Sequence, residues 1–453
     1  MVEATANSIE DFLVDGLSFK LKKGASYVNE RKSVTYHPQG SNIYSTSGTK
    51  LIKILVSGDN WLDPSTFRVM FDLMNMETDG AKLLRPISGP HSFFKRMRIL
   101  CNGQIVEDID DFNRVSEMFM LLTAKDAKKN FEAEGFGRVL DNRDFHNNNN
   151  LNATNFKGIQ VGQGQTVLFK PLSGLLNQSK YLPLRYCPLT IELELVNDAG
   201  TPVISPASST TGSSGVFQVS NCSTVWQIQN VQAKCDICVL DNSLENSYTE
   251  HLLSGRALPI NYNTFISQLQ NVLSGTNGQQ KVRLNVTRAL SRLKSVFISL
   301  NNMTNASVEM KEWNTFYSPM FNLTDGRYNG YDSGKEFECQ LSLGAKLYPE
   351  YPLRSHAEAY YQLRKTMGSH SSNVQSFDID GHEYRDTKMI IGIDMERVLE
   401  AGFTGMNTKA GDILNIRFDH KSGTPSEYAH SMHVVMQSDN IMEIRDGGIT
   451  VFD

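Results

Sequence analysis

The sequence predicts an all-β protein with few helical inserts, folded as two antiparallel sandwiches in tandem. Apolar and polar residues alternate along many short segments, as in strands that bury one face. Turn signals of two residues join several of these segments, and long polar connections separate others. The chain has 453 residues, which is enough for two sandwiches of roughly 200 residues each.

Alternation predicts strands in both halves of the chain. In residues 67–73, four large apolar side chains fall on one face, which we expect to be buried. Other segments repeat the pattern, and each predicts a strand that faces a core. These segments are residues 189–195, 233–239, 282–286 and 414–418.

Two turn signals predict antiparallel hairpins. Asn102-Gly103 separates residues 98–101 from 104–107, and Asn-Gly is the pair that best tolerates the positive φ angles of a two-residue turn. Near the carboxyl end, the sequence Asp-Gly-Gly at residues 446–448 separates two further apolar segments. Each signal marks a hairpin.

Helical spacing of apolar residues is limited to inserts between strands. It predicts helices over residues 111–133, 244–253 and 355–367, with Ser243 as the cap of the second. Long polar connections, which we expect to be surface loops, also interrupt the strands. They cover residues 141–164, 197–224 and 369–386.

The chain divides into two similar halves. Each half begins with extended segments, carries a helical insert and ends in well-alternating strands. Runs of strands with long crossing loops favour antiparallel sandwiches over parallel α/β units, and two jelly rolls in tandem fit best. We expect an N-terminal arm over residues 1–41, a first jelly roll over 42–243 and a second over 244–453.

Composition and charge exclude several classes of protein. With 44 Lys and Arg against 49 Asp and Glu, the formal net charge is -5, so the chain lacks the basic surplus of a protein that neutralises DNA phosphates. Six scattered cysteines are too few for a disulfide framework, and we expect free thiols. No signal peptide and no apolar run of about 18 residues is visible, so we expect no membrane-spanning helix.

Catalytic signatures are missing from the sequence. It contains no phosphate-binding loop motif, no His-Glu-x-x-His zinc helix and no Gly-x-Ser-x-Gly nucleophile elbow. Gly162-Gln163-Gly164 lacks the third glycine of a dinucleotide site, so it predicts a turn. We therefore predict no enzyme activity, no catalytic residues and no cofactor.

Three weak metal-binding patterns favour structural roles. Cys235 and Cys238 have zinc-knuckle spacing, but residues three apart on a strand point to opposite faces, and no second pair exists. His430 and His433 fail as a chelating pair for the same reason. Residues 378–383 resemble the start of a calcium loop without its remaining ligands, which favours an acidic surface turn. We predict no metal site.

Glu192 and Glu194 leave an alternative function open. They share a strand face and are about 7 Å apart, a distance compatible with the paired carboxylates of glycoside hydrolases. The polar face of an ordinary amphipathic strand looks identical, and the three tryptophans are too scattered to suggest a sugar-binding platform. A jelly-roll carbohydrate-binding module or glycoside hydrolase remains the alternative.

One short basic stretch lies near the N terminus. It consists of Lys20, Lys22 and Lys23, followed by Arg31 and Lys32. A mobile arm with these charges can touch DNA or an acidic neighbour, although short charge runs are usually solvated. Several Asn-x-Ser/Thr sequons also occur, and chance accounts for them in a chain so rich in Asn and Ser.

Three strings resemble the major capsid proteins of polinton-like viruses and virophages. They are residues 89–103 (GPHSFFKRMRILCNG), 181–195 (YLPLRYCPLTIELEL) and 250–255 (EHLLSG). The order of features is similar over nearly the whole chain. The resemblance implies a double jelly roll, three copies of which form a pseudo-hexagonal capsomer. It implies that capsomers tile an icosahedral shell around double-stranded DNA.

The same resemblance implies partners and a place in the virion. Neighbouring capsomers and penton or minor capsid proteins would surround each homotrimer, residues 197–224 would project outward, and residues 1–41 would lie on the inner side. The residues support this hypothesis independently, because two similar sandwiches per chain let a trimer present six comparable edges to a hexagonal lattice. A mildly acidic body suits a wall that encloses DNA without sequence-specific binding.

Overall fold

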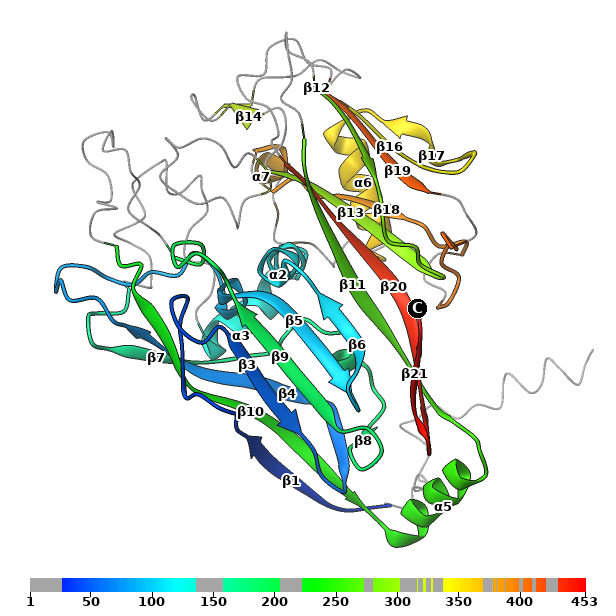
Figure 1. The fold of residues 1–453 in the computed structure, drawn as a ribbon. Helices are drawn as coiled ribbons and strands as arrows, with labels where there is room; N and C mark the ends of the chain where they lie inside the picture. The colour runs from blue at the N-terminus through cyan, green and yellow to red at the C-terminus, as the bar shows by residue number, and fades with distance from the viewer. Residues whose placement is uncertain are drawn as a thin grey trace, which may run out of the picture.

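Two antiparallel β-sandwiches, joined through a helix, make up the computed structural model (Figure 1). The structure describes residues 27–135, 158–203, 222–272, 280–301, 316, 321–322, 327–328, 337–369, 377, 379, 381–386, 388–398, 402–409, 413–420 and 431–453. Among them, no helix is both long and apolar enough to cross a membrane.

The first sandwich packs a six-stranded sheet against a four-stranded one (Figure 1). The six-stranded sheet has the order β1 (Val28–Tyr36), β10 (Trp226–Leu240), β4 (Trp61–Asn75), β7 (Gly164–Phe169), with β2 (Ile43–Tyr44) on β10 and β8 (Leu182–Pro183) on β4. The four-stranded sheet has the order β3 (Leu51–Val56), β9 (Leu189–Leu195), β5 (Phe94–Cys101), β6 (Gln104–Ile109).

The second sandwich is built in the same way from a five-stranded and a four-stranded sheet. The first of these has the order β11 (Leu258–Asn271), β20 (Ser431–Arg445), β13 (Leu293–Asn301), β18 (Ile391–Asp394), with β21 (Gly448–Phe452) on β20. The second has the order β12 (Gln280–Asn285), β19 (Leu414–His420), β16 (Phe337–Leu343), β17 (Lys346–Leu353); β14 (Phe321–Asn322) and β15 (Arg327–Tyr328) form a separate pair.

The two sandwiches share one topology. If the eight main strands of each half are numbered along the chain, one sheet has the order 1-8-3-6 and the other has the order 2-7-4-5, in both halves. Each half also inserts its helices between the fifth and sixth of these strands: α2 (Phe112–Leu121) and α3 (Lys125–Glu134) in the first, α6 (His356–Thr366) and α7 (Gly381–Asp386) in the second. The predicted similarity of the halves is a repeat of topology, and two tandem jelly rolls are confirmed.

Alternation of apolar residues places the core where the sequence predicts it. The side chains of Phe67, Val69, Phe71 and Leu73 are completely buried, with the intervening side chains of β4 partly exposed. Buried residues from both sandwiches form one continuous core. Both predicted hairpins are also present, and Asn102 and Gly103 have φ angles of 48° and 82°.

The predicted helices are present with two changes. The helix expected over residues 111–133 is two helices, because α2 ends at Leu121 and α3 begins at Lys125. The helix α5 (Asn242–Leu253) connects the sandwiches, and its cap is Asp241 rather than Ser243: the Asp241 carboxylate accepts a hydrogen bond from the Ser243 backbone N–H.

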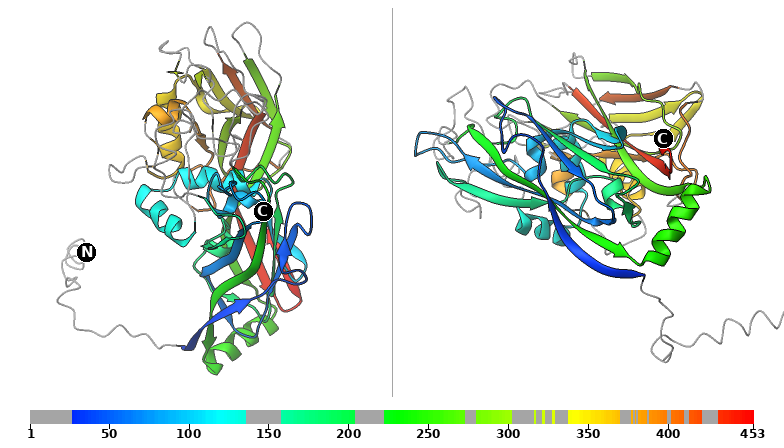
Figure 2. Two further views of the ribbon diagram at one scale, coloured as in Figure 1. Left: turned by 90° about the vertical axis from the view of Figure 1, so that its left-hand side faces the viewer. Right: turned by 60° about the horizontal axis from the view of Figure 1, so that its bottom comes forward.

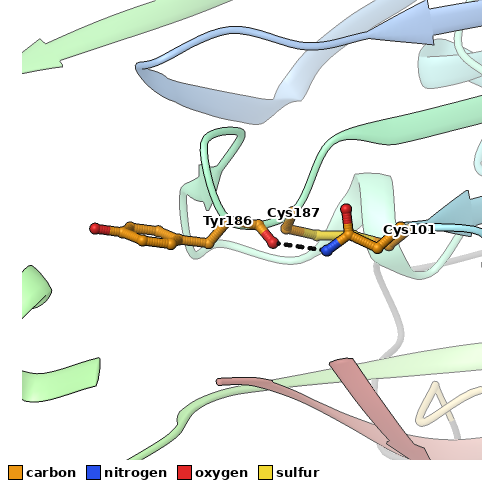
Figure 3. The surroundings of a disulfide bond; sticks show 4 residues. Cys101, Tyr186 and Cys187 are labelled. Atoms are coloured by element: carbon orange, nitrogen blue, oxygen red, sulfur yellow. Dashed lines mark hydrogen bonds between the residues drawn. A yellow bond between two sulfur atoms is a disulfide. The ribbon is translucent and has the colours of Figure 1, made fainter. Parts of the chain in front are cut away.

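The expectation that all cysteines are free is wrong for one pair. Cys101, at the end of β5, and Cys187, just before β9, form a disulfide with a Cα–Cα distance of 5.6 Å (Figure 3). The sheet explains the pairing, because Cys101 lies opposite Leu189 of β9, which brings Cys187 alongside. The side-chain amide of Asn102 donates to the Tyr186 carbonyl at 3.1 Å beside the bond. The remaining four cysteines are free and buried.

The strand β1 belongs to the first sandwich. Its residues pair with β10 in antiparallel register, for example Lys32 with Ile237 and Val34 with Cys235. Residues 28–36 of the predicted arm therefore form an edge strand of a sheet, whereas residues 1–26 lie outside the described residues.

Candidate functional site: the junction between the two sandwiches

The two sandwiches meet along β11, which lies beside β6 and the short helix η3 (Leu175–Asn177) of the first sandwich (Figures 1 and 2). β11 and β20 pair along their whole length, but β13 pairs only with residues 431–438 of β20. The other end of the β11–β20 ribbon therefore extends past β13, and its residues 258–264 are available to contact the first sandwich.

Glu107 of β6 is the polar centre of this junction. Its carboxylate accepts hydrogen bonds from the Ser173 hydroxyl, from the Gly174 N–H at 2.9 Å and, across the junction, from the Thr264 hydroxyl at 3.3 Å. Burial raises the pKa of Glu107 to about 7, although these donors favour the charged form and act in the opposite direction. The group therefore titrates near neutral pH inside the molecule.

Close backbone contacts fix the position of β11. The Tyr262 hydroxyl donates to the Val106 carbonyl at 2.8 Å, and burial raises the pKa of Tyr262, so that the hydroxyl stays protonated. A Cβ atom at Gly174 would lie 1.5 Å from the carbonyl oxygen of Asn263. Only glycine permits this approach of the two backbones.

Arg114 reaches from α2 into the second sandwich. Its side chain is 1% exposed, and the guanidinium lies over the ring of Phe316 at 4.6 Å from the centroid. Its Nη2 atom is 3.5 Å from the hydroxyl of Ser299 on β13. A cation stacked on an aromatic face in a desolvated position is a stabilising contact of about 2 kcal/mol.

A second set of polar side chains lies at the N-terminal end of α2. The Ser267 hydroxyl lies 3.4 Å from Asp111 Oδ2 and 2.8 Å from His433 Nε2, so it links α2 to β11 and β20. Burial, followed by the charge of Arg114, lowers the pKa of His433 well below its ordinary value, and His433 is therefore neutral. Burial is also the main cause of the raised pKa of Asp111.

Aromatic side chains complete the contact. The Phe119 ring of α2 lies 4.6 Å from the Phe265 ring and 5.2 Å from the Phe297 ring, both in the second sandwich. The junction thus combines apolar contact, directional hydrogen bonds and a buried cation. This arrangement fixes the angle between the two sandwiches.

Glu192 and Glu194, the two glutamates of the alternative function, lie on β9 between the charged side chains of β3 and β5, and Glu192 is buried. Glu192 accepts from Arg98 Nη2 at 2.9 Å and lies 3.6 Å from Lys53 Nζ, so strands on both sides engage its carboxylate. Glu194 lies opposite Arg96 in the sheet register. The pair shares a face as predicted; Glu192 takes part in cross-strand ion pairs, whereas the Arg96 opposite Glu194 is paired with Asp108 of β6.

The cysteines and the described histidine of the metal-like patterns take part in packing and hydrogen bonding. Cys235 packs in the main core and Cys238 packs in a separate cluster with Trp61, which confirms that they point to opposite faces of β10. Burial raises the pKa of Cys235 to about 12. His433 belongs to the junction, and His430 lies outside the described residues. Within the described ranges, no three His, Cys, Asp or Glu side chains are placed to share a metal ion.

The remaining predicted segments are only partly described. Gly162 has a φ of 72° in a turn before β7, as its sequence predicts. Of the calcium-loop-like segment, Asp378 and Asp380 lie outside the described residues, and Gly381 begins the helix α7. This part of the expected acidic turn is therefore helical.

The basic stretch is described only in its second part. Lys20, Lys22 and Lys23 lie outside the described residues, as do residues 204–221 of the expected outward loop. Arg31 lies on β1 and forms ion pairs with nearby aspartates. Its charge is therefore already matched within the sandwich.

Sequence reasoning missed the junction residues. Glu107 and Arg114 are polar residues in segments predicted to be a strand and a helix, where a solvent-facing position is the ordinary expectation. The one sequence signal was the position of Arg114. It directly precedes Val115, the first residue of the apolar stripe of the predicted helix, and so lies close to the face that was expected to be buried. Its buried partners are about 185 residues away in the sequence, in the second sandwich.

Comparison with solved structures identifies the fold. PBCV-1 VP54, fitted into a cryo-EM reconstruction of the virophage Sputnik, matches with a TM-score of 0.60 and 11% identity over 96% of this chain and 99% of that chain. The chain is a double jelly roll. The Sputnik virophage structure matches with a TM-score of 0.60 and 11% identity, over 97% of this chain and 92% of its own. No protein-family description and no curated protein sequence matches the chain.

The double jelly roll is shared over both sandwiches, not over one. The Faustovirus major capsid protein matches with a TM-score of 0.55 and 8% identity, over 97% of this chain and 94% of that chain. Coverage of this extent includes the junction, so the tandem arrangement itself is common to these structures. At 8–11% identity the likeness is one of fold.

Proposed function

We propose that this double jelly roll is a viral major capsid protein of the polinton-like virus and virophage group. Three copies form a pseudo-hexagonal capsomer, and capsomers tile an icosahedral shell around a double-stranded DNA genome. The observation that carries the proposal is the repeated strand order of the two sandwiches in a fold that viral capsid structures share along almost their whole length.

Symmetry connects this fold to that function. A trimer of chains with two like sandwiches offers six comparable outer faces, so closed threefold symmetry yields a nearly sixfold block. The block is regular only if the angle between the sandwiches is the same in every copy. Buried contacts such as Arg114 on Phe316 and Glu107 with Thr264 supply that constancy.

The domain division follows from the same elements. We propose that the first jelly roll ends with β10, that α5 is the connector, and that the second jelly roll begins with β11. An N-terminal arm in this proposal is the segment that precedes β1, and its inner position and any DNA contact by Lys20, Lys22 and Lys23 are part of the proposal.

Assembly uses surfaces that a single chain leaves open. Among the described strands, β17 pairs only with β16, which makes it an edge strand, and its Tyr351 is 80% exposed. Exposed edges of this kind invite pairing unless a neighbour covers them. We propose that adjacent copies cover such edges within the capsomer, whereas capsomers contact one another and penton or minor capsid proteins through more polar surfaces.

A serine, a histidine and a glutamate of the first sandwich resemble the residues of a hydrolase relay but lack its geometry. Ser88, His91 and Glu117 lie together, but the Ser88 hydroxyl and His91 Nε2 both bond to the same Glu117 oxygen, the latter at 2.9 Å. A hydrolase relay needs the serine and the carboxylate on opposite ring nitrogens of the histidine. The role that we propose for this chain is structural, with DNA enclosed and not read.

Electron microscopy of negatively stained purified protein tests the proposal. We expect threefold particles with a six-cornered outline. If microscopy instead shows isolated two-lobed monomers, and the same protein binds a glycan in a glycan-array assay, the carbohydrate-binding alternative would be favoured. If Glu192→Gln abolished the turnover of a glycan without changing the particle size, a glycoside hydrolase would replace the capsid proposal.

A further inference from the structure

A cavity of about 350 Å³ lies in the first sandwich where the helical insert covers β7. Its walls come from α2, α3, the 3-10 helix η2 (Pro90–Phe93) and the segment from β7 to η3. Phe119 and Met120 of α2, Phe131 of α3 and Phe169 of β7 make most of the lining apolar. The cavity lies beside the junction, because Phe119 and Ser173 line it and also take part in the junction contacts.

Its size selects a small ligand. Its volume of about 350 Å³ lies at the lower end of the roughly 300–1,000 Å³ that is typical of small-molecule sites. Ligand sites of this volume commonly pair an apolar lining with a few polar groups that fix orientation. The cavity has both.

Of the charged side chains that line the cavity, Lys170 favours the binding of an anion. Lys170 Nζ donates to Asn177 Oδ1 at 2.7 Å, and no described carboxylate lies within ion-pair distance of it. Burial, followed by the charge of Arg68, lowers the pKa of Lys170, and the charge of Asp63 offsets this only in part. Glu134, which also lines the cavity, is 3.7 Å from Arg68 and is thereby paired.

The remaining polar groups of the lining are neutral or engaged elsewhere. Ser88 and His91 bond to Glu117 behind the wall. The Ser116 hydroxyl is buried and has no hydrogen-bond partner among the described residues. The side-chain NH₂ of Asn177 remains able to donate next to Lys170, because its oxygen is the atom that Lys170 uses.

We propose that this cavity binds an alkyl carboxylate of about ten carbons, with the carboxylate at Lys170 and Asn177 and the chain among Phe119, Met120, Phe131 and Phe169. Because α2, α3 and β7 all line the cavity, an occupant braces the helical insert against the sandwich.

Titration calorimetry with decanoate on the full chain tests this inference. We expect saturable binding of one decanoate per chain and at least ten-fold weaker binding of decanol, which has the same chain length without the charge. Lys170→Met should reduce decanoate binding to the level of decanol. Lys180→Met is the matched control, because Lys180 is an exposed lysine outside this cavity that donates to the Pro259 carbonyl. It should bind decanoate like the natural chain.

A second variant tests where the alkyl part of the ligand binds. Ala127 is an exposed residue of α3 on the lining, and Ala127→Trp should fill the cavity and abolish binding of both decanoate and decanol. Equal affinity for decanol and decanoate, an unchanged affinity in Lys170→Met, or no saturable binding to the natural chain would overturn the proposal. Native mass spectrometry of the same samples reports the oligomer separately, so that decanoate binding by a monomer contradicts the capsomer and leaves this inference standing.

Discussion

The Tyr262 hydroxyl of the second sandwich donates a 2.8 Å hydrogen bond to the Val106 carbonyl of the first. The bond is buried, and next to it the carboxylate of Glu107 accepts a hydrogen bond from Thr264. Two adjacent residues of β6, Val106 and Glu107, thus accept hydrogen bonds from two alternate residues of β11, Tyr262 and Thr264. The junction is therefore a specific register between β6 and β11, which a purely apolar contact would not impose.

Gly174→Ala should loosen this register. The added methyl would lie 1.5 Å from the carbonyl oxygen of Asn263, so β11 must move away from η3. We expect a loss of about 2 kcal/mol or more in the free energy of unfolding, measured by urea denaturation. Gly80→Ala is the control, because a Cβ there meets no atom within 4 Å. Equal stability of the two variants would show that the close approach at Gly174 is absent.

Glu107 should make stability depend on pH. Its folded pKa of about 7 lies above the value of 4.5 expected in the unfolded chain. The folded state therefore binds the proton more tightly, and the contribution of this group is fully present below pH 4.5 and is lost as the pH rises towards 7. The difference between the two pKa values corresponds to roughly 3 kcal/mol.

Glu107→Gln removes that titration while keeping an acceptor for the Gly174 N–H. Denaturation at pH 5 and pH 8 should show that the natural chain loses more stability than the variant as the pH rises. Glu350→Gln, an exposed change on β17, should follow the natural chain. A Glu107→Gln protein with the same pH dependence as the natural chain would contradict the assignment.

Strands and hairpins were predictable because their signals are local. The alternation around Phe67 and the Asn102-Gly103 turn act within a few residues, and the structure confirms both. The break between α2 and α3 was not predictable, because neither Gly nor Pro marks it. The cap of α5 was ambiguous because Asp241 and Ser243 are both good capping residues.

Long-range contacts explain the rest of what the sequence could not indicate. The disulfide joins residues 86 positions apart, and the Arg114–Ser299 contact spans 185. A polar residue on a strand or helix does not reveal whether water or another domain will cover it. The junction thus follows from how the sandwiches dock, and no local pattern encodes that docking.

Arg114 should be essential for the stability of the junction. Arg114→Ala leaves a cavity beside Phe316 and removes the cation near Asp111, and we expect a loss of about 3 kcal/mol. Arg114→Lys should recover only part of this loss, since an ammonium group cannot stack as a planar guanidinium does. Denaturation of both variants, with the exposed change Arg354→Ala as control, measures the effect. A neutral Arg114→Ala would contradict the account.

The Cys101–Cys187 bond should stabilise the first sandwich. Thiol titration of the unreduced, denatured protein should find four free thiols, which are the four buried cysteines outside the bond. Reductant should lower the stability of the natural chain by about 2–4 kcal/mol and leave the double variant Cys101→Ser, Cys187→Ser unchanged. Six reactive thiols would exclude the disulfide.

Sedimentation equilibrium of the purified chain tests the central claim most directly. Three copies of a 50.8 kDa chain give a mass of about 152 kDa, and the capsomer hypothesis predicts this mass over a wide concentration range. A chain that remains at 50.8 kDa at the highest concentration, while correctly folded, would contradict it.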